Sequence, residues 1–169
     1  NVGACKELVT VLFAKGIQNI AYLGSHMDQM VNRCRYQGYE EAYRKGKRKL
    51  NQDLVYTDLS SRAMVEKAVE ELKNSGVECI LCQDDYICDE VVRKLARMGV
   101  RIPDQMKVAS CHYSRILENY PITITSLKFN ITELGRRSCQ VLLDKIHGKT
   151  VPDKTLLDYE IILKESTKG

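Results

Sequence analysis

Residues 78–113, ECILCQDDYICDEVVRKLARMGVRIPDQMKVASCHY, decide the fold of this chain. The stretch contains two short, continuous apolar runs at 79–82 and 106–111, with a helical pattern at 87–98 between them. Uninterrupted apolar runs are typical of strands that helices cover on both faces of a parallel sheet. The stretch therefore predicts a strand–helix–strand unit.

Polar residues follow both predicted strands of this unit. Gln83, Asp84 and Asp85 come directly after the first strand, and Cys111 and His112 end the second. In open sheets of this kind, ligands bind in the crevice beyond the carboxyl ends of the strands. We therefore expect a binding site near these residues.

The remaining sequence alternates helical and strand patterns in the same way. Helical patterns occupy 3–15, 28–46 and 134–146, and a further helix runs to Lys73 after a cap at Asp58, Ser60 or Ser61. Strands are predicted at 17–23, 54–56, 122–127 and 156–163. This alternation predicts an α/β fold, a three-layer α/β/α sandwich with a mainly parallel sheet.

Composition and charge narrow the class of protein. A chain of 169 residues suits one domain, and its 44% hydrophobic and 28% charged residues are typical of a globular protein. No apolar run approaches a membrane span, so we expect a soluble protein without a membrane partner. The first sixteen residues predict a helix and not a signal peptide. Seven cysteines inside apolar patterns are interpreted as reduced thiols, which favours the cytoplasm.

Several short motifs, taken together and in order, resemble the effector-binding domain of the lactose/galactose repressor family of bacterial transcription regulators. The motifs are RYQGY at 35–39, QDD at 83–85, GVRIP at 99–103, ITSL at 124–127 and LG at 134–135 with LL at 142–143. The resemblance covers nearly the whole chain. It implies the two-subdomain fold of the periplasmic sugar-binding proteins, of which this chain would supply the C-terminal portion.

The resemblance also implies an arrangement of subdomains and partners. Residues 18–127 and 155–165 would form the second subdomain, and the helices in 1–16 and 128–148 would turn apolar faces toward a mostly missing first subdomain. A helix-turn-helix head outside this chain would contact operator DNA. The family forms homodimers, so the helix at 87–98 and the final strand are candidate interface elements.

Arg35 is the leading candidate for a ligand contact. The matching arginine of the family reaches into the cleft between subdomains, and a guanidinium can grip two oxygens with its fixed fork of donors. The alternative is an exposed helical arginine beside Arg33. Asp84 is predicted to accept hydrogen bonds from the ligand, and Asp85 to cap the following helix.

His112 departs from the pattern of the family, which usually has an aspartate at this position. A histidine accepts through one ring nitrogen only and can carry a positive charge. The preferred hypothesis is a modified or anionic effector that Arg35 and His112 bind together, and the alternative is a strand-end histidine bonded to a nearby loop. Ser25, His26 and Leu59 are further ligand candidates by position alone.

The acidic and cysteine motifs favour simpler roles than catalysis or metal binding. Adjacent residues on one turn, such as Asp84 and Asp85, rarely point toward a common substrate atom, as a catalytic pair of carboxylates must. We therefore expect that the protein is not an enzyme. Cys79 and Cys82 form a C-x-x-C, but side chains alternate between the two faces of a strand, so residues three positions apart point to opposite faces, which favours core packing over a metal or redox site. No cofactor is expected. The expected function is a regulator's sensor for a sugar, sugar derivative or other small metabolite; a solute-binding protein of sugar transport is the alternative.

Overall fold

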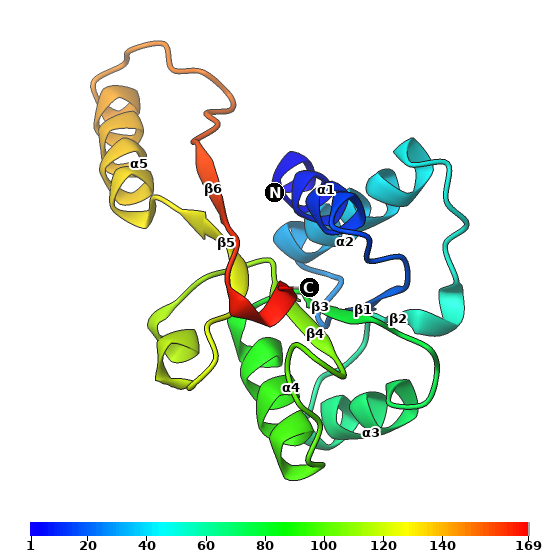
Figure 1. Cartoon of the computed structure of the whole chain (residues 1–169). Coiled ribbons are helices and arrows are strands. Elements are labelled where there is room, and N and C mark those ends of the chain that lie inside the picture. The colour runs from blue at the N-terminus through cyan, green and yellow to red at the C-terminus, as the bar shows by residue number, and fades with distance from the viewer. Residues whose placement is uncertain (169) are drawn as a thin grey trace.

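The two apolar runs of the 78–113 stretch form neighbouring strands in a computed structural model that describes residues 1–168 (Figure 1). Strands β3 (Cys79–Cys82) and β4 (Lys107–Ser110) are parallel, with Cys79 opposite Lys107 and Cys82 opposite Ser110. Helix α4 (Asp85–Arg97) connects them and begins two residues earlier than its apolar pattern. The predicted strand–helix–strand unit is confirmed.

The unit lies at the centre of a six-stranded sheet with the order β2-β1-β3-β4-β5-β6. The first five strands in this order are parallel, and β6 runs antiparallel to β5. The other strands are β1 (Ile20–Leu23), β2 (Val55–Tyr56), β5 (Thr125–Phe129) and β6 (Tyr159–Ile162). The other helices are α1 (Val2–Ala14), α2 (Met30–Lys45), α3 (Arg62–Leu72) and α5 (Ile131–Ile146), with short 3-10 turns η1 (Gln52–Leu54), η2 (Arg115–Asn119) and η3 (Glu165–Thr167).

Helices cover both faces of the sheet, so the predicted three-layer α/β/α architecture is confirmed. Helices α1 and α2 lie on one face, and α3 and α4 on the other (Figure 1). Each face has its own hydrophobic core. Consecutive residues of β3 point alternately into the two cores, which is why its apolar run is unbroken.

Helix α1 packs inside this chain, and the expectation that it would turn an apolar face toward a missing subdomain is wrong. Its apolar residues, among them Cys5, Leu8 and Leu12, are buried against α2 and the sheet. Gly38 on α2 allows the close approach, because a Cβ there would lie 2.4 Å from the carbonyl oxygen of Val2 and 2.8 Å from the Cβ of Cys5. The α1 face is thus part of the core.

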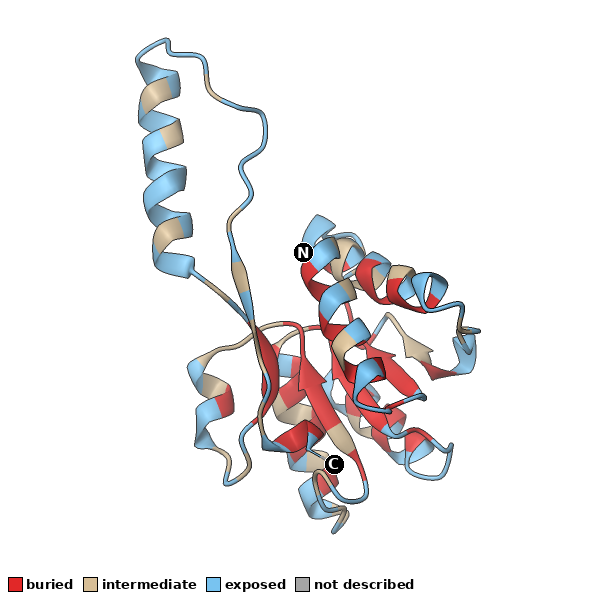
Figure 2. Ribbon diagram, turned by 45° about the horizontal axis from the view of Figure 1, so that its top comes forward, coloured by how far each residue is buried: buried red, intermediate tan, exposed pale blue. Residues whose placement is uncertain are grey.

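Helix α5 contrasts with α1, because none of its residues is buried (Figure 2). With the segment that leads back to β6, it extends away from the layered body (Figure 1). Its exposed apolar side chains include Ile131, Leu142 and Ile146, at 68%, 60% and 69% exposure. That this helix packs on another subdomain stays a prediction.

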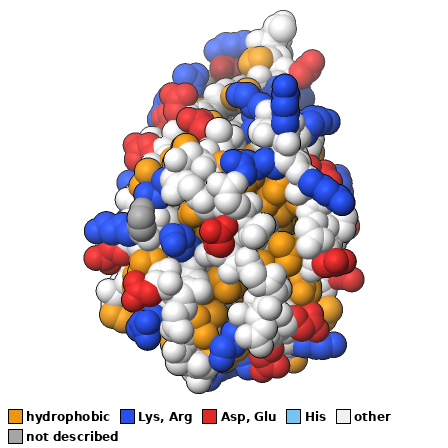
Figure 3. All heavy atoms as spheres, turned by 45° about the vertical axis from the view of Figure 1, so that its right-hand side comes forward, with side chains coloured by type: hydrophobic (Ala, Val, Ile, Leu, Met, Phe, Trp, Pro, Cys, Tyr) orange, Lys and Arg blue, Asp and Glu red, His pale blue; other side chains and the backbone are white. Residues whose placement is uncertain are grey.

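The surface carries both signs of charge. Lys and Arg side chains are interspersed with Asp and Glu side chains over the face in Figure 3. Within residues 1–168, no helix combines the length and apolar character that crossing a membrane requires.

Candidate functional site

The carboxyl ends of the parallel strands bring together the loops that the sequence singles out. Gln83, directly after β3, is fully buried, and its Oε1 accepts from the backbone N–H of Ser25 at 3.2 Å and from the hydroxyl of Tyr22 at 3.4 Å. Gly24 makes room for this amide, because a Cβ there would lie 2.5 Å from Gln83 Oε1. Gln83 therefore fixes the start of the loop after β1.

The six predicted ligand residues divide between two cavities. The first, here called the arginine cavity, has a volume of about 310 Å³ and is lined by Arg35 and His112, together with Phe129 and Asn130. The second, here called the serine cavity, has a volume of about 320 Å³ and is lined by Ser25, His26, Leu59 and Asp84, together with Tyr86 and Glu90. The structure brings Arg35 and His112 together and places the other four residues apart from them.

Arg35 is held by the packing of α2. One turn after it, Gly38 lets α2 touch α1, and the buried Tyr39 donates its hydroxyl to the carbonyl of Ile20 at 2.7 Å. The Nε of Arg35 is buried and has no hydrogen-bond partner among residues 1–168. An unsatisfied buried donor is destabilising by about 1–3 kcal/mol or more, so this nitrogen is suited to a ligand acceptor.

His112 is oriented by Asp85, which follows the neighbouring strand. The Nδ1 of His112 lies 3.1 Å from Asp85 Oδ1. Burial alone would raise the pKa of Asp85, but hydrogen bonds from Ser114 and His112 outweigh it and hold this pKa below its usual value. Because an ionised carboxylate only accepts, Nδ1 carries the hydrogen, and Nε2 of the ring is left for a ligand.

The prediction that Asp85 caps the helix is wrong, because the cap is Asp84; that Asp84 also contacts a ligand stays a prediction. Asp84 is the N-cap of α4 and accepts from the backbone N–H of Ile87 at 2.9 Å, while Asp85 is the partner of His112. Because the helix begins two residues before its apolar pattern, the capping position falls on the first aspartate. The three-residue spacing from Asp84 to Ile87 is the capping signal that could have indicated this.

Phe129 is a site residue that sequence reasoning missed. It ends β5, and its ring lies nearly parallel to that of His112, with ring centroids 6.4 Å apart and an angle of 19° between the planes. The predicted strand stopped at residue 127, but pairing with β6 extends it to Phe129, which lies opposite Tyr159. Phe129 gives the arginine cavity an apolar wall beside its polar groups.

Cys79 and Cys82 lie on opposite faces of β3, as predicted. Cys79 belongs to the core under α1 and α2, and Cys82 to the core under α3 and α4. Burial raises the pKa of both thiols. Residues 1–168 contain no group of three or more His, Cys, Asp or Glu side chains placed to hold a metal ion.

Comparison with known proteins identifies a family. The sequence profile of the periplasmic binding protein-like domain matches residues 9–167. The HTH-type transcriptional regulator CelR of Thermobifida fusca is 25% identical over 169 residues, covering 98% of this chain and 50% of CelR. The HTH-type transcriptional regulator GntR of Escherichia coli (strain K12) is 26% identical and covers 92% of this chain and 47% of GntR. The chain thus spans about half the length of these curated relatives.

Solved structures of transcription regulators have the same fold. The regulator CcpA of Lactococcus lactis aligns with a TM-score of 0.89 at 23% identity, covering 99% of this chain and 62% of that one. The complex of the transcriptional regulator CelR with cellobiose aligns with a TM-score of 0.87 at 24% identity, covering 98% and 52%. The fold and the relatives agree with the resemblance that the sequence motifs show. On the match over residues 9–167, the chain belongs to the periplasmic binding protein-like domain family.

Proposed function

We propose that this chain is the effector-sensing portion of a bacterial transcription regulator, that it has no catalytic activity, and that its effector binds in the arginine cavity. The observation that carries the proposal is the buried, unpartnered Nε of Arg35 in a cavity that His112 also lines. The names of the curated relatives support a regulator. One structural neighbour is a complex with cellobiose, which supports a small-molecule effector.

The residues of the cavity favour an anionic or otherwise modified sugar over a plain one. The guanidinium of Arg35 can donate two hydrogen bonds to a phosphate or carboxylate. His112 offers Nε2, which becomes a second cationic donor when the ring takes up a proton. Phe129 supplies a flat apolar surface that suits the C–H face of a sugar ring. A sugar phosphate or a sugar acid would use all three residues.

The cavity also suggests how binding would be transmitted. Arg35 and His112 belong to the layered body, whereas Ile131 and Leu134 of α5 and residues 155–157 line the other side of the same cavity. A ligand that contacts both sides favours one arrangement of the body and the α5 segment over another. In a homodimer in the cytoplasm, this shift would alter the spacing of DNA-binding heads that lie outside this chain.

A solute-binding protein of a sugar transport system is the second candidate, because it would share the fold. The regulators among the relatives favour the first candidate. The gene sequence upstream of Asn1 distinguishes the two: a helix-turn-helix segment supports the regulator, and a signal peptide supports the transport protein.

A thermal-shift screen of the purified protein tests the effector site. The panel contains neutral sugars, sugar phosphates, sugar acids and nucleobases, since a ligand specific to the native state raises the unfolding midpoint. We expect a sugar phosphate or sugar acid to give a shift that Arg35→Ala and His112→Ala each abolish. Arg44→Ala is the matched control, because Arg44 lies on the same helix with its side chain exposed.

Two outcomes would contradict the proposal. A shift that is as large in both site variants as in the unmodified protein would place the ligand elsewhere. A response to neutral sugars alone, unchanged by His112→Ala, would remove the anionic class of effector while leaving the regulator proposal standing.

A further inference from the structure

Cys5 and Cys111 form a pair of buried thiols that the proposed function does not use. Cys5 lies in the second turn of α1 and Cys111 directly follows β4, so 106 positions of sequence separate them. Their Sγ atoms are 3.5 Å apart, and both residues are fully buried. The two sulfurs face each other without a covalent bond.

The pair adjoins the two polar residues of the arginine cavity, Arg35 and His112. Cys111 immediately precedes His112 in the chain. Cys5 packs at Gly38 of α2, one helical turn after Arg35. A change in the separation of the two sulfurs therefore acts on the backbone next to His112 and on the contact that sets the position of α2.

We propose that Cys5 and Cys111 are a reversible disulfide site, and that the oxidised form changes the geometry of the arginine cavity. A disulfide bond is about 2.05 Å long, so the sulfurs must approach by roughly 1.5 Å. The protein interior is closely packed, so α1 and the end of β4 would shift together with their neighbours. The position of Arg35 relative to His112 would change with them.

The oxidant is a peroxide, and the reaction balances. The sulfur of one cysteine attacks hydrogen peroxide, the O–O bond breaks, and a sulfenic acid and one water are formed. The second sulfur then attacks the sulfenic sulfur, the S–O bond breaks and a second water leaves. Two thiols give up two electrons and two protons, and one peroxide becomes two waters. A dithiol such as dithiothreitol reverses the change by thiol–disulfide exchange.

The surroundings of the pair set the rate of oxidation. The hydrogen bond with Cys111 and burial raise the pKa of Cys5, and the positive charge of Arg35 opposes them. Because the thiolate is the reactive form, oxidation is expected to be slower than that of the exposed Cys139. An anionic ligand that neutralises Arg35 would slow it further.

Peptide mapping by mass spectrometry tests the disulfide without any effector. The purified protein is treated with hydrogen peroxide over a time course, blocked with N-ethylmaleimide and digested. We expect a linked pair of peptides that contain Cys5 and Cys111, two hydrogen masses lighter than the reduced pair, and its loss after dithiothreitol. Cys5→Ser and Cys111→Ser should each abolish it. If either variant fails to fold by circular dichroism, the alanine variants replace them.

The same samples contain internal controls. Cys82 and Cys88 are a second pair of buried neighbouring thiols, in the opposite core. Full oxidation of Cys139 shows that the peroxide has acted. If no Cys5–Cys111 link has formed by the end of a time course that extends well beyond the full oxidation of Cys139, or if only a Cys82–Cys88 link is present, the proposal is wrong.

A separate measurement tests whether the disulfide changes the arginine cavity. The measurement itself needs no effector, but its link to effector binding rests on the proposed function. Diethyl pyrocarbonate modifies accessible histidine rings, and this chain has three, His26, His112 and His147. We expect oxidation to change the modification rate of His112 at least twofold and to leave the other two unchanged. A linked protein with an unchanged His112 rate would overturn the coupling to the cavity. An effector screen without hits would count against the proposed function and leave both measurements interpretable.

Discussion

The imidazole Nδ1 of His112 lies 3.1 Å from Oδ1 of Asp85, so a histidine in the loop after β4 is oriented by the first residue of the helix after β3. The Asp85 side chain is almost fully buried and that of His112 is 30% exposed. One side of the ring is thus fixed by the protein while the other remains available to a ligand.

Asp85→Asn should lower the free energy of unfolding at neutral pH and make it less dependent on pH in the acid range. The pKa of Asp85 is lowered in the folded state, so the carboxylate contributes stability that is present above the unfolded pKa of about 3.9 and is lost as pH falls through the folded pKa. At pH 7 we expect a loss of about 1–3 kcal/mol. Urea unfolding between pH 7 and pH 3 measures this loss and its pH dependence. Asp153→Asn is the control, because Asp153 is exposed. Equal pH profiles for Asp85→Asn and the unmodified protein would contradict the role of this pair.

His112→Asp should be less stable at neutral pH than His112→Asn. The substitution places a second carboxylate beside Asp85, and two like charges at this separation cannot both ionise without a penalty. We expect a difference of about 1–2 kcal/mol in the free energy of unfolding at pH 7, since each pKa unit corresponds to about 1.4 kcal/mol. The difference should shrink as the pH approaches 4 and one carboxyl takes up a proton. A constant difference over this pH range would show that charge is not its cause.

Gly38→Ala should separate α1 from α2. The added Cβ would lie 2.4 Å from a backbone oxygen, which cannot move aside as a flexible side chain could. Overpacking of this kind typically destabilises by about 1–3 kcal/mol. Gly135→Ala is the matched control, because Gly135 also lies inside a helix and a Cβ there meets nothing within 4 Å. The control should gain about 0.5–1 kcal/mol from helix propensity. Chemical denaturation of both variants decides the matter, and a neutral Gly38→Ala would contradict the close packing.

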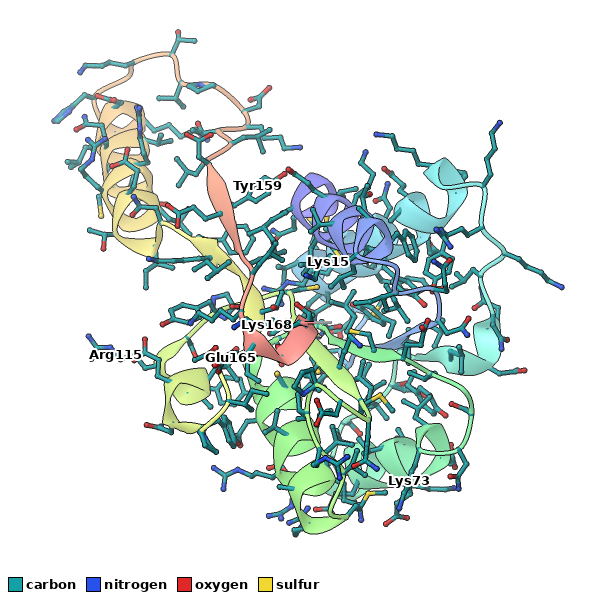
Figure 4. All side chains as sticks on the ribbon, in the orientation of Figure 1. Lys15, Lys73, Arg115, Tyr159, Glu165 and Lys168 are labelled. Carbon is teal, nitrogen blue, oxygen red and sulfur yellow. The ribbon has the colours of Figure 1, made fainter. Side chains whose placement is uncertain are left out.

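Ser166→Ala should loosen the C-terminal turn from the sheet. Ser166 is fully buried in η3, donates to the carbonyl of Val108 at 2.6 Å and accepts from the backbone N–H of Thr125 at 2.9 Å. Figure 4 shows this turn, marked by Glu165 and Lys168, against β4 and β5. Removing the hydroxyl leaves two buried backbone groups unpaired, so we expect a loss of about 2–6 kcal/mol at roughly 1–3 kcal/mol for each group.

Hydrogen exchange at β4 and β5 should become faster in Ser166→Ala. Ser138→Ala on the exposed face of α5 serves as its control and should change neither stability nor exchange. If the two serine variants unfold at the same midpoint, the turn does not hold the sheet.

The base of the α5 segment illustrates what sequence patterns could not provide. Phe129 and Tyr159 lie opposite each other in the β5–β6 pair, and Tyr159 donates its hydroxyl to Glu7 of α1 at 2.5 Å. These contacts join residues more than 25 positions apart, so no local periodicity indicates them. The extension of β5 to Phe129, and with it one wall of the arginine cavity, depends on them.

The sequence by itself determined the class of fold and the strand ends at which to look for a site. The central strand–helix–strand unit follows from local apolar patterns, because the periodicities of helices and buried strands are properties of the chain alone. The tertiary structure decided where each side chain goes. It buried α1, placed the helix cap on Asp84 and the partner of His112 on Asp85, and divided the six candidate residues between two cavities. Those outcomes depend on where a helix begins and which elements meet, and these are set by packing between distant parts of the chain.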